Sequence, residues 1–120
     1  MNNATMSRIA TIAYALVIVV FGVTHFANTQ EFRNFVPAFI PGGGFWVYLT
    51  GAFLLASGIA ILINKKVRLA AILLTVLLLC FALLVHLPRT INGFDSGVGL
   101  IMKDIGLAAG ALLIASRSQS

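Results

Sequence analysis

The chain has 120 residues, of which 60% are hydrophobic and only 9% are charged. A water-soluble domain carries roughly a quarter charged residues because its surface must be polar, so this composition excludes a soluble globular fold and indicates an integral membrane protein. The net charge of +5 does not predict nucleic-acid binding, since the basic residues form no stripe interleaved with aromatic side chains.

Four apolar segments are each close to the length of about 20 residues that an α-helix needs to cross the hydrocarbon core. They run over residues 9–28, 45–63, 67–87 and 98–115. The first is longer than the core of a secretory signal peptide, and no A-x-A cleavage site follows it, so we expect it to remain as a helix. The sequence therefore predicts an all-α fold, a four-helix membrane bundle in a single domain of residues 1–120.

The distribution of basic residues predicts the orientation of this bundle. The N-terminus, the short link between the second and third spans and the C-terminus carry Arg8, Lys65, Lys66, Arg68 and Arg117. The opposite side has Arg33 and Arg89, with Lys103 just inside the last span. Short loops rich in Lys and Arg stay cytoplasmic, so we expect both termini on the cytoplasmic side. Trp46 and Tyr48 at the outer start of the second span fit this orientation, because amphipathic aromatic side chains favour the interface.

The connection between the first two spans is unusually apolar for a loop. Its apolar residues recur at the spacing of one helix face, which predicts a short amphipathic segment interrupted by Pro37 and ended by Pro41. The residues of that face are Phe32, Phe35, Val36, Phe39 and Ile40. On the outer side of the membrane, such a segment either lies in the interface or folds over the mouth of the bundle as a lid.

Small residues at spacings of four predict where helices approach closely. The last span contains Gly106 and Gly110, and the second contains Ala52, Ala56 and Ala60. We expect these faces to pack inside the bundle or to form the seam of a homo-oligomer.

Cys80, the only cysteine, lies in an apolar run where a buried thiol is expected. A single cysteine excludes an intramolecular disulfide or a CxxC redox pair.

Ionisable residues within spans are costly, so they are the candidate functional residues. His25 and His86 lie near the outer ends of the first and third spans, and His25 shares a helix face with Tyr14, Ile18, Phe21 and Asn28. Lys103 and Asp104 fall about 8–9 Å inside the last span, at 1.5 Å per residue. Since consecutive residues point in different directions, Asp104 is expected to turn toward Ala108 and away from Lys103. The candidate ligand-binding residues are His25, His86, Arg89, Lys103, Asp104 and Trp46.

Three interpretations of this polar cluster stay open. The residues serve structural hydrogen bonding and interfacial placement, they line a pocket for a lipid-soluble ligand such as a quinone, or the two imidazoles hold a haem. In the quinone interpretation, a His or Lys hydrogen-bonds a ring oxygen and an imidazole relays a proton. A metal site is not expected, because the two histidines and the aspartate lie on different spans without ligand spacing.

Several short stretches together resemble the DoxX-like family of small bacterial membrane proteins. They are FGVTHF in the first span, FVPAFIP in the connection, and WVYLTGAFLLASGIAILI followed by a basic turn and Arg-Leu-Ala-Ala, so that the similarity covers roughly residues 15–90. The resemblance implies a four-helix membrane bundle, located as a multi-pass protein in the bacterial cytoplasmic (inner) membrane. It also implies an association with quinone-coupled oxidation of sulfur compounds or with membrane oxidoreductase assemblies.

The sequence leaves three functions open and does not decide whether the chain is an enzyme. The first is a redox-associated subunit that binds quinone and exchanges electrons with a membrane or peripheral protein partner, since GxGxxG and P-loop patterns are absent. The second is a non-enzymatic subunit that assembles or stabilises a membrane complex. The third is a small transporter, which ranks last because Asp104 is the only acid within a span and the first span has none.

Overall fold

The structure of the protein, a computed structural model, describes residues 1–36, 38–93 and 98–119. Over these residues the chain is helical, with turns between the helices and no strand. The helices are α1 (Asn3–Ala27), α2 (Thr29–Arg33), α3 (Gly43–Leu62), α4 (Val67–Cys80), the π-helical η1 (Phe81–His86), α5 (Leu87–Ile91) and α6 (Val98–Ser116). Four helical stretches are long and apolar enough to span a membrane, namely α1, α3, the continuous stretch Val67–Ile91 and α6. The predicted all-α fold with four spans is confirmed.

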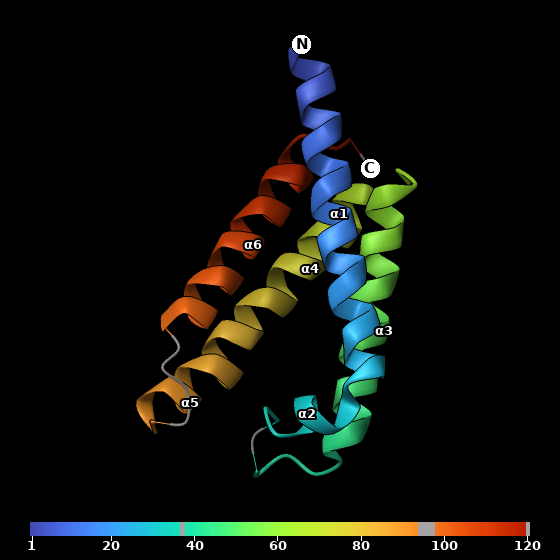
Figure 1. Ribbon diagram of the computed structural model, residues 1–120. Helices are drawn as coiled ribbons and strands as arrows, with labels where there is room; N and C mark the ends of the chain where they lie inside the picture. Colours follow the sequence, from blue (N-terminus) through green and yellow to red (C-terminus); the bar gives the residue numbers. More distant parts are fainter. Residues whose placement is uncertain (37, 94–97, 120) are drawn as a thin grey trace.

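The helices associate as two pairs. The most extensive contacts join α1 to α3 and α4 to α6, while α3 contacts α4 less extensively. Figure 1 shows both termini and the α3–α4 turn at one end, with α2 and α5 at the other, and the two pairs diverge toward the second end. We call the first the basic end, defined by Arg8, Lys65, Lys66, Arg68 and Arg117, and the second the aromatic end, defined by Phe32 and Phe35.

Large apolar side chains cover the outside of the bundle. Examples from each span are more than two-fifths exposed: Leu16, Val20, Ile59, Leu83 and Leu113. Apolar side chains exposed over all spans would be unfavourable in water but are solvated by lipid acyl chains. The exposure pattern therefore agrees with a multi-pass membrane protein. Cys80 is part of this surface, so the expectation of a buried thiol was wrong.

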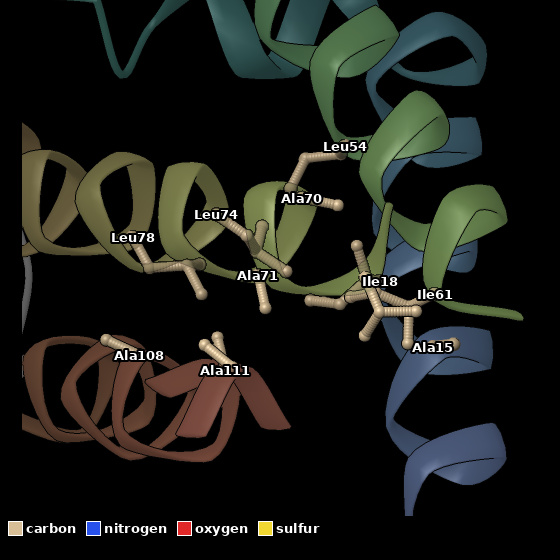
Figure 2. Close-up of a cluster of buried hydrophobic side chains, with 12 residues drawn as sticks. Ala15, Ile18, Leu54, Ile61, Ala70, Ala71, Leu74, Leu78, Ala108 and Ala111 are labelled. Carbon is tan, nitrogen blue, oxygen red and sulfur yellow. The ribbon is translucent and has the colours of Figure 1, made fainter. Parts of the chain in front are cut away.

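The core lies where the two pairs meet. Figure 2 shows Ile18 of α1 and Leu54 of α3 near Ala71 and Leu74 of α4, with Ala111 of α6 facing α4. Alanines on the facing sides of α4 and α6 let the two backbones approach closely, which strengthens dispersion contacts in a membrane. The core is therefore built from small and medium apolar side chains from all four spans.

Glycines hold α1 against α3. A Cβ atom added at Gly22 would lie 2.8 Å from Leu55 Cγ and 2.9 Å from the Leu55 backbone nitrogen. At Gly58 it would lie 2.8 Å from Val19 Cγ2 and 3.1 Å from the Val19 backbone nitrogen. Backbone atoms cannot move aside as a flexible side chain can, so the close approach of α1 and α3 requires glycine at these positions.

Of the two roles expected for the other small residues, packing inside the bundle is largely absent from the structure. Ala52, Ala56 and Gly106 are exposed, and an added Cβ at Gly106 would meet nothing within 4 Å. Ala60 packs against the core only in part. Gly110 does face a neighbour, since an added Cβ would lie 2.9 Å from Tyr14 Cε2. The buried face of α6 is instead Asp104, Ala108, Ala111 and Ala115.

The third span is longer than the predicted 67–87 because it passes through Pro88. Leu87 donates its backbone N–H to the carbonyl of Ala82, five residues earlier, as in a π-helix. Proline lacks an N–H and its ring clashes with the carbonyl four residues before it in a regular α-helix. The shifted hydrogen-bond register of η1 accompanies this proline, and the helix continues as α5 to Ile91.

The connection at the aromatic end forms less helix than its apolar spacing predicts. The helix α2 ends at Arg33, and residues 34–36 continue as a turn and a bend. The residue before a proline is disfavoured in the α conformation, which agrees with the early end, although Pro37 itself lies outside the described residues. The expected stripe is consequently divided, because Phe32 and Phe35 are partly buried while Phe39 is 85% exposed.

Candidate functional site

The centre of the candidate site is an imidazole–carboxylate pair between the third and fourth spans. His86 Nε2 lies 3.0 Å from Asp104 Oδ2, and the two side chains are 12% and 2% exposed. The π-helical turn ends at His86, and Asp104 lies on the buried face of α6. Asp104 therefore lies on the face that it shares with Ala108, as the sequence predicts. That this face points into the bundle was not predicted, because the face of Gly106 and Gly110 was the one expected to pack.

The position of Asp104 favours one of the two nitrogens of neutral His86 as the proton carrier. A carboxylate only accepts hydrogen bonds, so Nε2, which faces Asp104, is the protonated nitrogen and Nδ1 is an acceptor. His86 Nδ1 is buried and has no hydrogen-bond partner among the residues that the structure describes. The contact is within ion-pair distance but is not an aligned hydrogen bond, since Asp104 Oδ2 also has no hydrogen-bond partner in the same part of the chain. Unpaired buried polar atoms are uncommon in folded proteins and are often found at functional sites.

Lys103 contributes the positive charge nearest to Asp104. Its Nζ lies 3.5 Å from Asp104 Oδ1 and 5.0 Å from the centre of the Phe21 ring, and its side chain is 42% exposed. The ammonium group thus contacts the carboxylate and an aromatic face while it remains partly outside the bundle. The half-exposed position agrees with the expectation that Lys103 and Asp104 cannot both face inward.

His25 is held by its own helix. Its Nδ1 lies 2.7 Å from the carbonyl oxygen of Phe21 in α1. A carbonyl also only accepts, so Nδ1 carries the proton in the neutral imidazole and Nε2 is an acceptor. The predicted face of the first span does point inward, since Ile18 is fully buried and Tyr14 donates a hydrogen bond to the carbonyl of Leu107 in α6.

Aromatic rings connect the two imidazoles. The His25 ring centre lies 4.6 Å from that of Phe32 and 6.4 Å from that of Phe81. Phe35 continues the row, 6.3 Å from Phe32 and 6.0 Å from His86. The connection thus contacts both histidines, through Phe32 and Phe35, which agrees with the lid among the two alternatives that the sequence leaves open.

Arg89 ties this connection to the third span. Its guanidinium donates to the carbonyl of Asn34 at 2.7 Å, and Cζ lies 4.4 Å from the centre of the Phe35 ring. The side chain is partly buried. Arg89 therefore belongs to the same cluster as His86, on the side that faces the connection.

Trp46 lies apart from the other candidates. Its indole Nε1 donates to the carbonyl of Pro41 at 2.9 Å, and its ring packs against Phe45 with 5.4 Å between the centres. Trp46 is 40% exposed. These contacts suit an interfacial residue that fixes the start of α3, rather than a member of the cluster around His86.

Two residues of the site were not singled out from the sequence. Phe81 stacks toward His25, and the hydroxyl oxygen of Thr90 is buried without a hydrogen-bond partner in the described ranges. Thr90 follows His86 by four residues, which is the spacing of neighbours on a helix face, so helical spacing was a usable signal for it. Phe81 precedes His86 by five residues, and no comparable pattern marks it.

The described residues 1–36, 38–93 and 98–119 contain no group of three or more His, Cys, Asp or Glu side chains gathered as metal ligands. Nor do the two imidazoles face each other across an open gap, since His86 Nε2 faces Asp104 and phenyl rings lie between the histidines. The arrangement therefore suits hydrogen bonding to a ligand better than axial ligation of a haem.

Comparison with known protein families places the chain in one of them. A family model described as a domain of unknown function, DUF8561, matches residues 14–115. The chain belongs to this family. The match covers the second and third spans, nearly all of the fourth, the part of the first span from Tyr14 onward and every candidate residue, so the site described above lies within the family's domain. No curated protein and no solved structure matches the chain.

Proposed function

We propose that this member of the DUF8561 family is a redox-associated membrane subunit that binds the ring of a quinone or quinol at the aromatic end. The observation that carries the proposal is the buried His86–Asp104 pair, whose second imidazole nitrogen has no partner within the described part of the chain. The resemblance of its sequence to DoxX-like proteins points to the same ligand class.

Hydrogen-bonding chemistry favours the reduced form of such a ligand. Neutral His25 offers Nε2, and neutral His86 offers Nδ1, so each imidazole presents an acceptor. A quinol carries two hydroxyl donors and a flat apolar ring, which matches two acceptors among the rings of Phe32, Phe35 and Phe81. Burial of the donors and acceptors away from water would favour their pairing.

The same groups can take up protons when the ligand is oxidised. Conversion of a quinol to a quinone releases two protons and two electrons. The imidazoles would accept the protons, and Asp104 would stabilise the imidazolium that forms at His86. The electrons would pass to a protein partner that carries a redox cofactor, because this chain has neither a thiol pair nor a nucleotide-binding motif.

Charge asymmetry supports a location for the site on the outer side of the bacterial cytoplasmic membrane. The basic end carries Arg8, Lys65, Lys66, Arg68 and Arg117, which favours its retention in the cytoplasm. Both termini then lie inside, and the aromatic end opens toward the outer leaflet.

Quinone content of the purified protein tests the proposal. We expect the full chain, extracted in mild detergent, to retain stoichiometric quinone and to bind a short-chain ubiquinol analogue. His86→Gln and Asp104→Asn should weaken that binding about tenfold or more, because each removes a buried charge-assisted interaction. Tyr48→Phe is the matched control, since Tyr48 is an exposed aromatic residue at the same end that packs on Phe26.

A second candidate, an assembly subunit of a membrane complex, is favoured by the exposed positions of Ala52, Ala56 and Gly106. Small residues on a lipid-facing helix let a partner helix approach closely. Absence of quinone from wild-type protein, no binding of the analogue, and co-purification of a membrane protein partner would support this function and overturn the redox proposal.

A further inference from the structure

A groove at the basic end is separate from the site at the aromatic end. It has a volume of about 590 Å³ and lies between the N-terminal half of α1, the end of α3 and the C-terminal half of α6. Much of the groove is apolar, with Ile12, Leu62 and Leu113 among the lining residues. Tyr14 and Gly110 are the lining residues of α1 and α6 that lie farthest along these helices from the basic end.

The rim of the groove is basic and hydroxylated. Arg8 and Arg117 both line it, and Arg117 donates to the hydroxyl of Ser7 at 3.4 Å across the gap between α6 and α1. An arginine has five N–H donors, so this bond leaves most of them for another acceptor. Within the described ranges the acidic side chains are Glu31 of α2 and Asp104 of α6, and neither lines the groove.

The groove combines two features that occur together in a phospholipid. Arg8 precedes Tyr14 by six residues, which is about 9 Å along a helix, so the apolar part extends from the rim toward the bilayer interior. A phosphate bound by the two arginines would place its acyl chain along that part. Basic pockets between transmembrane helices near the membrane surface are a recurring form of binding site for anionic lipid headgroups.

We propose that this groove binds an anionic phospholipid, with the phosphate at Arg8 and Arg117 and an acyl chain directed toward Tyr14 and Gly110. The positive charge of Arg8 and Arg117, which no acidic side chain among the described lining residues offsets, selects the anionic lipid over a zwitterionic one. The site does not depend on the ligand at the aromatic end, so either proposal can fail without the other.

Lipid retention tests this site with a charge-matched control. The full chain is reconstituted into phosphatidylcholine nanodiscs with a minor fraction of phosphatidylglycerol, released into mild detergent and examined by native mass spectrometry. We expect wild-type protein to retain phosphatidylglycerol selectively. Arg8→Gln with Arg117→Gln should weaken retention by about 100-fold, at about tenfold for each charge-assisted hydrogen bond to the phosphate. Lys65→Gln with Lys66→Gln removes the same charge from the same end but outside the groove, and should change retention by only a few-fold.

A second variant tests the groove by its volume and leaves its charge unchanged. Its result does not depend on whether the arginine variant folds. Ala10 lines the groove and is exposed, so Ala10→Phe should block the acyl chain and abolish retention while the helical circular dichroism stays unchanged. Retention of phosphatidylglycerol by Ala10→Phe, or equal losses in the arginine and lysine pairs, would overturn the proposal. Displacement of the lipid by millimolar inorganic phosphate would show a site for free anions and would overturn it too.

Discussion

Helical spacing in the sequence explains the helix face on which an ionisable side chain of the site lies, but not which side chain it contacts. The helical repeat predicts that Asp104 shares a face with Ala108 and that Lys103 does not, and both side chains lie accordingly. The contact of Asp104 with His86 was not predictable in detail, because it depends on the direction of His86 after a π-helical turn. Helical spacing therefore gives the face of a residue, and the partner depends on tertiary packing.

The buried pair should behave as one energetic unit. His86→Leu leaves Asp104 without its imidazole, and Asp104→Leu leaves an unpaired imidazole, so each should lower the free energy of unfolding by about 1–3 kcal/mol. The double variant should lose less than the sum of the two, with a coupling of about 1–2 kcal/mol. Unfolding in mixed detergent micelles measures these values. Lys103→Leu is the control and should cost under about 1 kcal/mol, because a half-exposed ion pair contributes little. Additive losses would contradict the pairing.

Among the helices, length and hydropathy predict the four spans, and the structure agrees except at the ends. The first span begins at Asn3 rather than Ile9, where Asn2 caps the helix by accepting a hydrogen bond from the Thr5 N–H at 2.8 Å. The third continues beyond the predicted end at Leu87 to Ile91, because η1 accommodates Pro88. Composition sets the existence of a span, whereas capping and hydrogen-bond register set its ends.

Small residues at the helix contacts show why a motif alone does not identify an interface. Ala52 and Ala56 have the spacing of a packing face, yet both are exposed. The contact of α3 with α1 instead uses Gly51 and Gly58, which lie on a different face of α3. Several faces of α3 carry small residues, so the sequence alone does not show which face packs against α1. The face that packs is the one that meets Gly22 of α1, where the two backbones approach closely.

Two alanine substitutions should separate a required glycine from an unneeded one. Gly22→Ala would place a Cβ 2.9 Å from the Leu55 backbone nitrogen, so α1 and α3 must separate, at a cost of about 1–3 kcal/mol in unfolding free energy. Gly106→Ala meets nothing within 4 Å and should be neutral or stabilising by up to about 1 kcal/mol, since alanine favours helix. Thermal unfolding of the two variants in detergent measures both effects, and equal losses would show that α1 and α3 do not approach as described.

At the scale of the whole molecule, the two ends differ in chemistry. The basic end holds five of the eight lysines and arginines, and the aromatic end holds Phe32, Phe35 and the titratable cluster around His86. The charge asymmetry was readable from the sequence because it depends only on loop composition. The groove at the basic end was not, since it arises from the way in which α1, α3 and α6 meet.

Both proposals depend on four helices that cross the bilayer with the basic end in the cytoplasm, and site-directed labelling tests this most directly. Cys80→Ser provides a background without cysteine, because Cys80 is the only one. Lys65→Cys and Phe39→Cys then place single thiols at exposed positions of the basic and aromatic ends. A membrane-impermeant maleimide should label Phe39→Cys in intact spheroplasts and Lys65→Cys only in inverted vesicles. Labelling of Lys65→Cys in spheroplasts, or of both positions from the same side, would contradict the account.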